Sequence, residues 1–318
     1  MDDIIFEECT KNYEKYIGKN VSYWQGLADK YQYESKDAIR GAWRREAKKR
    51  GYNRSSGGIE KKLGGPKILI FDIETTPLVA YTFSLWPERI STDQVIRDWH
   101  ILSYSAKWLF QDEVMSEVLT PKEIEKADDK RLTKSLWELF DESDVIVGYN
   151  GLNFDVKRCN TRFLINGFLP PSHYSVVDPI VTAKKVFDFS SNKMDYLSEM
   201  LNLDRKIHTD FSLWSRCMDG QEDALEEIRT YNQQDTKVLE SLYLEILPWI
   251  NIHPNWNLFY EDEVERCPHC GSVNIKKNTG TYKTMVNSYP EFTCGDCGYR
   301  GREKKSIVSK EKSKTILR

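Results

Sequence analysis

A short apolar run that carries two acids constrains this chain more than any other feature. Residues 68–75 read Ile-Leu-Ile-Phe-Asp-Ile-Glu-Thr, rich in β-branched residues and typical of a buried strand. Side chains alternate between the faces of a strand, so Asp72 and Glu74 are predicted to project to the same side. Two such carboxylates are costly without a cation between them, and Mg²⁺ or Mn²⁺ fits ligands of this kind. Alone, the pattern also occurs at solvated strand ends.

Two further acids lie downstream at positions that could complete a metal site. Residues 145–150 predict a buried strand and a turn, after which Asp155 falls in the first turn of a helix, where the helix dipole favours a carboxylate. In a long predicted helix, Tyr231 and Asp235 are four residues apart and share a face that borders an apolar stripe. The ordinary alternatives are a stabilising early-turn acid and a surface Tyr–Asp pair.

The apolar pattern predicts an α/β fold between residues 66 and 252. Strands come first and helices alternate with a strand afterwards, which favours a mixed sheet covered by helices on both faces. The expected strands are 68–73, 80–85, 101–108, 114–119 and 145–149. The expected helices are 131–140, 154–165, 180–186, 196–201 and 222–247.

Taken together, the acids form three motifs in a fixed order, Asp72-x-Glu74, Asn150-x-x-x-Phe154-Asp155 and Tyr231-x-x-x-Asp235. This set resembles the DEDD (DnaQ-like) 3′–5′ exonucleases. The match is to the tyrosine subclass, because the histidine subclass would need histidine where this chain has Thr230. The second motif looks most like that of the proofreading domains of family B DNA polymerases. The resemblance covers residues 66–252 and implies a ribonuclease H-like fold and metal-dependent 3′–5′ exonuclease activity.

The resemblance also implies a role for each residue in two-metal hydrolysis of a phosphodiester. Asp72 would bridge two Mg²⁺ or Mn²⁺ ions. Glu74 and Asp235 would hold the ion that activates the water, and Asp155 would hold the ion on the leaving-group side through water. Tyr231 would orient the attacking water. Three residues would lie near the terminal nucleotide, namely Thr75, Asn150 and Phe154.

Four of the seven cysteines form two closely spaced pairs, Cys267-Pro-His-Cys270 and Cys294-Gly-Asp-Cys297. With 23 residues between them, the pairs resemble a zinc ribbon of slightly long spacing, which a hairpin of strands near 272–275 and 291–293 would accommodate. Four thiolates would bind one structural Zn²⁺. His269 lies inside the first pair as an alternative ligand and is expected to be exposed. The remaining cysteines are expected to be half-buried thiols, namely Cys9, Cys159 and Cys217.

Charge is unevenly distributed along the chain. Residues 36–67 hold eleven Lys or Arg against three Asp or Glu, and the tail from Arg300 is basic again. Residues 1–50 predict a small all-α domain resembling a helix-turn-helix, in which Thr10 and Ser35 can cap helices. Four basic residues on its last helix are spaced four apart and form a stripe suited to DNA or RNA phosphates, namely Lys36, Arg40, Arg44 and Lys48. The alternative is a solvated basic face.

The sequence therefore predicts five segments. They are the helical domain 1–50, a flexible glycine-rich linker 51–65, the exonuclease domain 66–252, the zinc ribbon 260–302 and a loose basic tail 303–318. The expected substrate is nucleic acid, with DNA favoured, as single strands or 3′ ends. The chain ends soon after the core, so we expect a free-standing enzyme or a proofreading or repair subunit beside a separate polymerase. No apolar run approaches the length of a membrane span and the start is acidic, so we expect a cytoplasmic, nucleoid-associated protein.

Three other functions stay open. A 3′–5′ exoribonuclease would use the same residues, since nothing in the sequence reads the 2′-hydroxyl. Transposase- or resolvase-type endonucleases combine similar parts but lack a tyrosine four residues before the last acid. A binding module with an inactive core would need at least one acid missing, and all four are present.

Overall fold

The chain separates into two compact units, residues 67–243 and residues 1–66 with 244–318. The computed structural model describes residues 1–16, 21–35, 38–39, 42–43, 46, 65–84 and 89–317. Among the described helices, none has the length and hydropathy needed to cross a bilayer.

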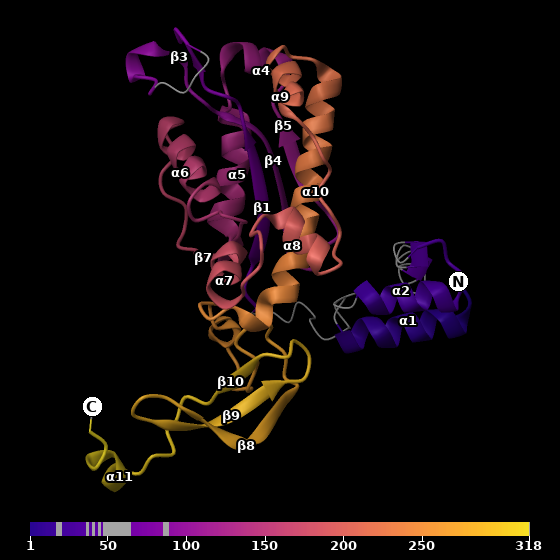
Figure 1. Ribbon diagram of the computed structural model, residues 1–318, viewed down its shortest axis with the longest axis vertical. Coiled ribbons are helices and arrows are strands. Elements are labelled where there is room, and N and C mark those ends of the chain that lie inside the picture. The colour runs from indigo at the N-terminus through magenta and orange to yellow at the C-terminus, as the bar shows by residue number, and fades with distance from the viewer. Residues whose placement is uncertain are drawn as a thin grey trace. The chain divides into compact units, whose positions relative to one another are not determined.

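A five-stranded mixed sheet forms the centre of residues 67–243 (Figure 1). Its strands are β1 (Ile68–Thr75), β4 (Ile101–Trp108), β5 (Met115–Val118), β6 (Val145–Val147) and β7 (Ser175–Val177). The order is β5-β4-β1-β6-β7. Strand β4 runs antiparallel to both of its neighbours, β5 and β1, and β6 and β7 run parallel to β1. The predicted α/β fold with a mixed sheet flanked by helices is confirmed.

Seven helices accompany the sheet in the described part of this unit. They are α4 (Pro121–Lys126), α5 (Lys130–Glu142), α6 (Asp155–Ile165), α7 (Pro179–Val186), α8 (Met194–Met200), α9 (Phe211–Met218) and α10 (Glu222–Ile246). The five predicted helices correspond to α5, α6, α7, α8 and α10. Helices α4 and α9 were missed. Helix α4 carries a readable start signal, since Thr120 accepts the Glu123 N–H and the Glu123 side chain accepts the Thr120 N–H in return.

The predicted strand 80–85 is wrong. Among the described residues 79–84, only β2 (Val79–Ala80) is a strand, and it pairs with β3 (Val95–Arg97) in a separate two-stranded sheet. Tyr81 and Phe83 are 75% and 97% exposed, so the apolar alternation that suggested a strand does not face the core.

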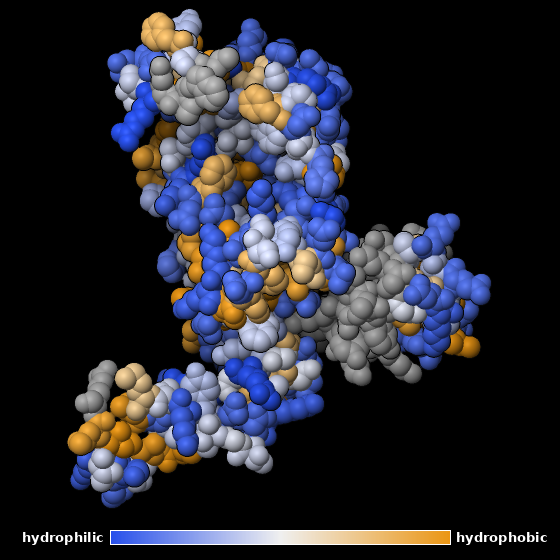
Figure 2. All heavy atoms as spheres, in the orientation of Figure 1, coloured by the Kyte–Doolittle hydropathy of each residue, from blue (hydrophilic) through white to orange (hydrophobic). Residues whose placement is uncertain are grey.

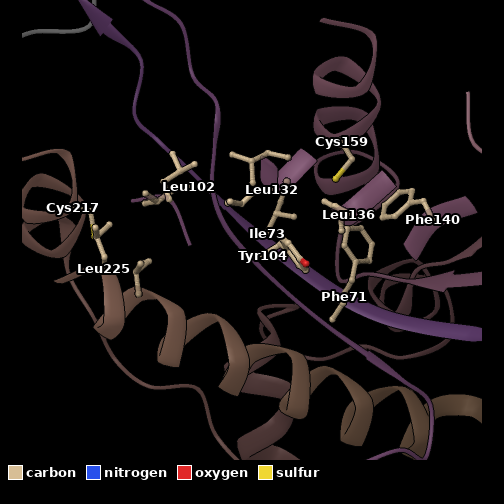
Figure 3. Packing of buried hydrophobic residues seen from close by; sticks show 14 of the residues in the cluster. Phe71, Ile73, Leu102, Tyr104, Leu132, Leu136, Phe140, Cys159, Cys217 and Leu225 are labelled. Carbon is tan, nitrogen blue, oxygen red and sulfur yellow. The ribbon is translucent and has the colours of Figure 1, made fainter. Parts of the chain in front are cut away.

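One face of the sheet packs on α5 and α6 through aromatic side chains. Figure 3 shows Phe71 of β1 next to Phe140 of α5, and their rings meet edge to face with centroids 5.0 Å apart. Phe163 of α6 contacts the same Phe140 ring at 5.4 Å. Because Phe71 and Ile73 occupy this core face, the alternate residues Asp72 and Glu74 must project from the other face.

Helix α10 covers that other face in register with β4. Three contacts repeat every two residues in β4 and every four in α10, namely Ser103 with Asn232, the Ser105 carbonyl with Thr236, and Lys107 with Glu240. Two strand residues rise by about 6.6 Å and four helical residues by about 6 Å, so the two repeats stay in step. This register fixes the position of α10 along its axis and its rotation about that axis. It therefore also fixes the position of Asp235 relative to the sheet.

The N-terminal residues contain α1 (Asp3–Tyr16), α2 (Val21–Lys30) and a further helical segment described at 38–39, 42–43 and 46. Ile39 and Trp43, predicted as an apolar face, are buried in a small core with side chains of α1 and α2. The predicted cap at Ser35 is present, since its Oγ accepts the Ala38 N–H at 3.1 Å.

The predicted cap at Thr10 is wrong. Helix α1 begins earlier, where Asp2 Oδ1 accepts the Ile5 N–H at 2.9 Å. Thr10 lies inside the helix and accepts a hydrogen bond from Trp43 Nε1 at 2.9 Å. The predicted basic stripe (Lys36, Arg40, Arg44 and Lys48) and most of the predicted linker lie outside the described residues.

A three-stranded antiparallel sheet of order β10-β9-β8 forms the C-terminal part, with β8 (Ile275–Lys283), β9 (Ser288–Cys294) and β10 (Arg300–Arg302). The first predicted strand, 272–275, overlaps β8 only at Ile275, and the second, 291–293, lies within the longer β9. The tail is not loose at its start, because the N–H groups of Glu303 and Ile307 donate to the carbonyls of Pro290 and Ser288 at 2.9 Å each. Helix α11 (Lys310–Lys314) follows. Figure 2 shows apolar side chains gathered on this C-terminal segment, which includes the exposed Ile307 and Leu317.

Candidate active site

The two acids of β1 meet one acid of α10. Carboxylate oxygens of Asp72, Glu74 and Asp235 all lie within 4.8 Å of one another. Asp235 is 1% exposed, its carboxylate forms an ion pair with Lys206, and burial raises its pKa against the lowering effect of Lys206 and of the Tyr231 hydroxyl. Three carboxylates that converge in this way fit the ligand set of a divalent metal such as Mg²⁺ or Mn²⁺.

Asp155 lies next to this cluster. It is 4% exposed at the first position of α6, and burial raises its pKa to about 7, against the lowering effect of the backbone amides of Asp155 and Ile73. Ile73 stands between Asp72 and Glu74 in β1, so the Asp155 carboxylate borders the strand that carries them. The structure therefore brings three predicted acids within ligand distance of one another and leaves the fourth beside them.

A tight loop between β6 and α6 sets the position of Asp155. Gly148 and Gly151 approach so closely that a Cβ on Gly151 would lie 3.0 Å from the Gly148 Cα. The Asp178 carboxylate accepts the N–H groups of Asn150 at 2.9 Å and Leu152 at 3.3 Å. Asp178 was not predicted as part of the site, and its only signal in the sequence is its position directly after β7 and before a proline.

Asn232 is a second residue that the motifs did not indicate. Its Nδ2 donates to Asp72 Oδ2 at 2.6 Å, and its Oδ1 accepts from Ser103 Oγ at 3.3 Å. The side chain is fully buried. Asn232 therefore fixes the orientation of Asp72 against β4. The sequence signal that could have indicated Asn232 is its spacing from Asp235, because a residue three positions earlier in a helix lies on the same face.

We expect Asn232→Ala to weaken divalent-metal affinity or activity by about 10- to 100-fold, as is usual when an orienting partner of a metal ligand is lost. The check is the Mn²⁺ concentration that gives half-maximal nuclease activity. Gln233→Ala is the matched control, because Gln233 Nε2 contacts Ser116 Oγ on β5 at 2.5 Å instead. Equal Mn²⁺ requirements for the two variants would contradict the orienting role.

Lys206 brings a positive charge to the acids. Its Nζ is 2.6 Å from Asp235 Oδ2 and 5.4 Å from the centroid of the Tyr231 ring. Burial lowers the pKa of Lys206, but the Asp235 and Asp72 carboxylates outweigh it and raise the pKa above its ordinary value. Gln234 Nε2 donates a hydrogen bond to the Arg205 carbonyl at 3.0 Å and so holds the backbone next to Lys206. Lys206 belongs to no motif, so only the folded chain shows its place.

Burial and mutual repulsion raise the pKa of each clustered acid. Burial and the Asp235 charge raise the pKa of Glu74 to about 8. The pKa of Asp72 is raised well above its ordinary value by burial first and then by Asp155. The folded, metal-free chain therefore binds protons that the unfolded chain has already released near neutral pH. Such groups favour folding at low pH, and their contribution is lost as the pH rises through the folded-state pKa.

We expect the metal-free protein to lose stability as the pH rises from about 4.5 to about 8, the ordinary and raised pKa values of Glu74. Mn²⁺ should raise the melting temperature more at pH 8 than at pH 6, because at lower pH it must displace protons. Thermal melts with and without Mn²⁺ test this, with Asp72→Asn as the control that should lose the shift. A shift independent of pH would contradict the account.

The residues expected near the terminal nucleotide border these acids. Thr75 ends β1, and Phe154, 36% exposed, directly precedes Asp155. The Arg158 guanidinium carbon lies 4.5 Å from the centroid of the Phe154 ring and 4.1 Å from that of Trp99. Trp99 and Arg158 were not predicted, and they add a stacked, positively charged surface beside Asp155.

The four paired cysteines converge in the other unit. Their sulfurs all lie within 4.8 Å of one another and all four residues are buried, namely Cys267, Cys270, Cys294 and Cys297. Gly271 and Gly298 follow the two pairs with φ of 69° and 77°, a conformation that glycine adopts without strain. The turn after Cys297 directs the Tyr299 N–H at the Cys297 sulfur, 3.4 Å away. Four thiols in this arrangement fit the closed tetrahedral ligand set of Zn²⁺.

The expected exposure of His269 is wrong. The side chain is 3% exposed, its Nδ1 contacts the Leu247 carbonyl at 3.1 Å, and its ring lies on Tyr299 with centroids 3.7 Å apart. Packing of the ring therefore anchors the first cysteine turn. The other three cysteines are fully buried rather than half-buried, namely Cys9, Cys159 and Cys217.

Comparison with known proteins identifies the family. No curated protein matches the chain. Among solved structures, the family B DNA polymerase from the hyperthermophilic archaeon Pyrobaculum calidifontis is 17% identical over 57% of this chain, with a TM-score of 0.42. The chain covers only 25% of that polymerase. Residues 69–247 match the RNase_H superfamily, a segment that contains the sheet and all four predicted acids.

The match extends over more than half of the chain, and nucleases of this superfamily typically use divalent metals, in agreement with the acidic cluster. The predicted ribonuclease H-like fold is thereby confirmed. The chain belongs to the RNase_H superfamily.

Proposed function

We propose that this protein is a nuclease, a metal-dependent 3′–5′ exonuclease that acts on DNA. The observation that carries the proposal is the convergence of Asp72, Glu74 and Asp235 within 4.8 Å, with Asp155 beside them. Tyr231 lies one helical turn before Asp235, as in the tyrosine subclass of DEDD exonucleases. Two divalent ions held by these acids would activate the attacking water and neutralise the charge on the leaving 3′ oxygen.

The side chains divide the work by position. Asp72, oriented by Asn232, would serve both ions, with Glu74 and Asp235 on the water side and Asp155 on the leaving-group side. Burial and the Asp235 charge raise the pKa of Tyr231 further above neutrality. Its phenol therefore stays protonated and orients the water by a hydrogen bond rather than acting as a base.

The remaining parts would bind the substrate and stabilise the chain. Thr75, Asn150 and Phe154 would contact the terminal nucleotide, with the Arg158 guanidinium beside Phe154. The cysteine cluster would bind one structural Zn²⁺, and the predicted basic stripe near the N-terminus would contact phosphates. We propose that the enzyme acts alone or beside a polymerase in replication or repair.

The test is digestion of 5′-labelled single-stranded DNA, the same sequence in RNA, and circular single-stranded DNA, each with Mg²⁺. We expect a ladder that shortens from the 3′ end of linear DNA and an intact circle. A cut circle would show an endonuclease, and faster digestion of RNA would show an exoribonuclease. No cleavage of any substrate at any Mg²⁺ or Mn²⁺ concentration would contradict the proposal.

A further inference from the structure

The C-terminal sheet sorts its side chains onto two faces. Residues directly opposite in antiparallel strands project to the same side. The face that carries Cys294 and Phe292 is turned toward the sulfur cluster. The register places seven side chains on the other face, namely Lys276, Tyr282, Tyr289, Glu291, Thr293, Arg300 and Arg302. We call this the outer face.

Aromatic rings and a guanidinium are stacked on the outer face. Tyr282 and Tyr289 are a direct cross-strand pair. The Arg302 guanidinium carbon lies 3.8 Å from the centroid of the Tyr289 ring and 5.9 Å from that of Tyr282. Tyr282 is 45% exposed, so this π-surface is open to a ligand.

The positively charged side chains of the outer face form no ion pairs with acidic side chains in the part of the chain that the structure describes. Its cations Lys276, Arg300 and Arg302 are exposed and form no ion pair there, and Glu291 is the only acid on this face. Lys277 on the opposite face, by contrast, pairs with Glu265 and Glu303. Among the described residues, the side that carries the tyrosines thus has three unpaired cations, against Lys283 alone on the opposite face.

We propose that the outer face binds a single-stranded polynucleotide. The cations would contact phosphates, and the tyrosines and Arg302 would stack with bases, the combination by which proteins hold single strands without sequence preference. A duplex offers this face only phosphates, because its bases are stacked on each other. The inference rests on nucleic acid being the substrate of the superfamily domain, and it adds a second contact that would retain the strand between successive cuts.

The test is binding of full-length protein to fluorescein-labelled oligothymidylate, measured by anisotropy in an Asp155→Ala background that leaves the probe uncut. Tyr282→Ala and Arg302→Ala should each weaken binding by about fivefold or more. Arg302→Ala should also reduce the slope of log affinity against log salt by about 0.7, as expected for one lost phosphate contact on a single strand. Tyr282→Phe should bind like the parent, because phenylalanine keeps the stacking surface.

Lys283→Ala is the matched control, since Lys283 is exposed in the same hairpin but pairs with Ser288 on the opposite face. Zinc content equal to that of the parent shows that each variant keeps its fold. Parent-like binding by Tyr282→Ala and Arg302→Ala would overturn the proposal, and so would equal weakening by Lys283→Ala or equal affinity for a blunt duplex. Binding does not require hydrolysis. A protein that shows this binding profile but cleaves no substrate would therefore contradict the proposed exonuclease activity and leave the proposed binding face supported.

Discussion

Replacing Asp72 with alanine is expected to lower the rate of phosphodiester hydrolysis by about 10³-fold or more, because the proposed two-metal site would lose the ligand shared by both ions. Asp155→Ala is expected to have an effect of the same order. The measurement is single-turnover hydrolysis of a single-stranded oligonucleotide with saturating Mg²⁺. Activity within tenfold of the wild type in either variant would contradict the assigned site.

Removing the charge of Asp72 should not unfold the protein. Burial raises the pKa of Asp72, which means that its ionised form costs folding energy in the metal-free chain. Asp72→Asn should therefore keep or raise the melting temperature without metal at pH 8 while activity is lost. Glu138→Ala, at an exposed position paired with Lys134, is the control and should leave rate and stability unchanged.

Replacing Cys270 with serine is expected to abolish zinc binding and unfold the C-terminal sheet, since a structural site of four thiolates contributes roughly 10 kcal/mol or more to a module of this size. Zinc content by mass spectrometry of metals and protease cleavage within residues 260–302 measure the effect. The acid cluster lies in the other unit, so hydrolysis of a short oligonucleotide should persist.

Cys217→Ser is the matched control for this substitution. Cys217 is also buried, but its sulfur donates to the Ala224 carbonyl at 3.3 Å, a bond that a serine hydroxyl can replace. Its zinc content and protease resistance should equal those of the wild type. Unchanged zinc in Cys270→Ser would show that the four sulfurs do not form the proposed site.

The residues of the candidate site could be predicted from the sequence where a local pattern fixes the direction of a side chain. Alternation along β1 placed Asp72 and Glu74 on one face, and helical spacing placed Tyr231 and Asp235 on another. The long helices α5, α6 and α10 were readable for the same reason, because each carries an apolar stripe over three turns or more, whereas the short helices α4 and α9 were missed. The strand expected at 80–85 failed because its aromatic residues face solvent, which alternation alone does not reveal.

Residues whose roles depend on tertiary pairing were not readable. Asn232 matters because the register of α10 with β4 brings it to Asp72, and Lys206 because a loop without a motif brings it to Asp235. His269 was misplaced for a related reason, since its burial depends on Leu247 and Tyr299, which are distant in sequence. Such pairings arise only when elements far apart in the chain are packed together.

Anomalous diffraction from crystals soaked in Mn²⁺ tests the central claim most directly. The account predicts two manganese peaks about 4 Å apart, with Asp72 between them and with oxygens of Glu74 and Asp235 coordinating one ion. The same soak of Asp72→Asn crystals should show at least one peak lost. If wild-type crystals bind manganese elsewhere and show no peak among these carboxylates, the proposed two-metal site is contradicted.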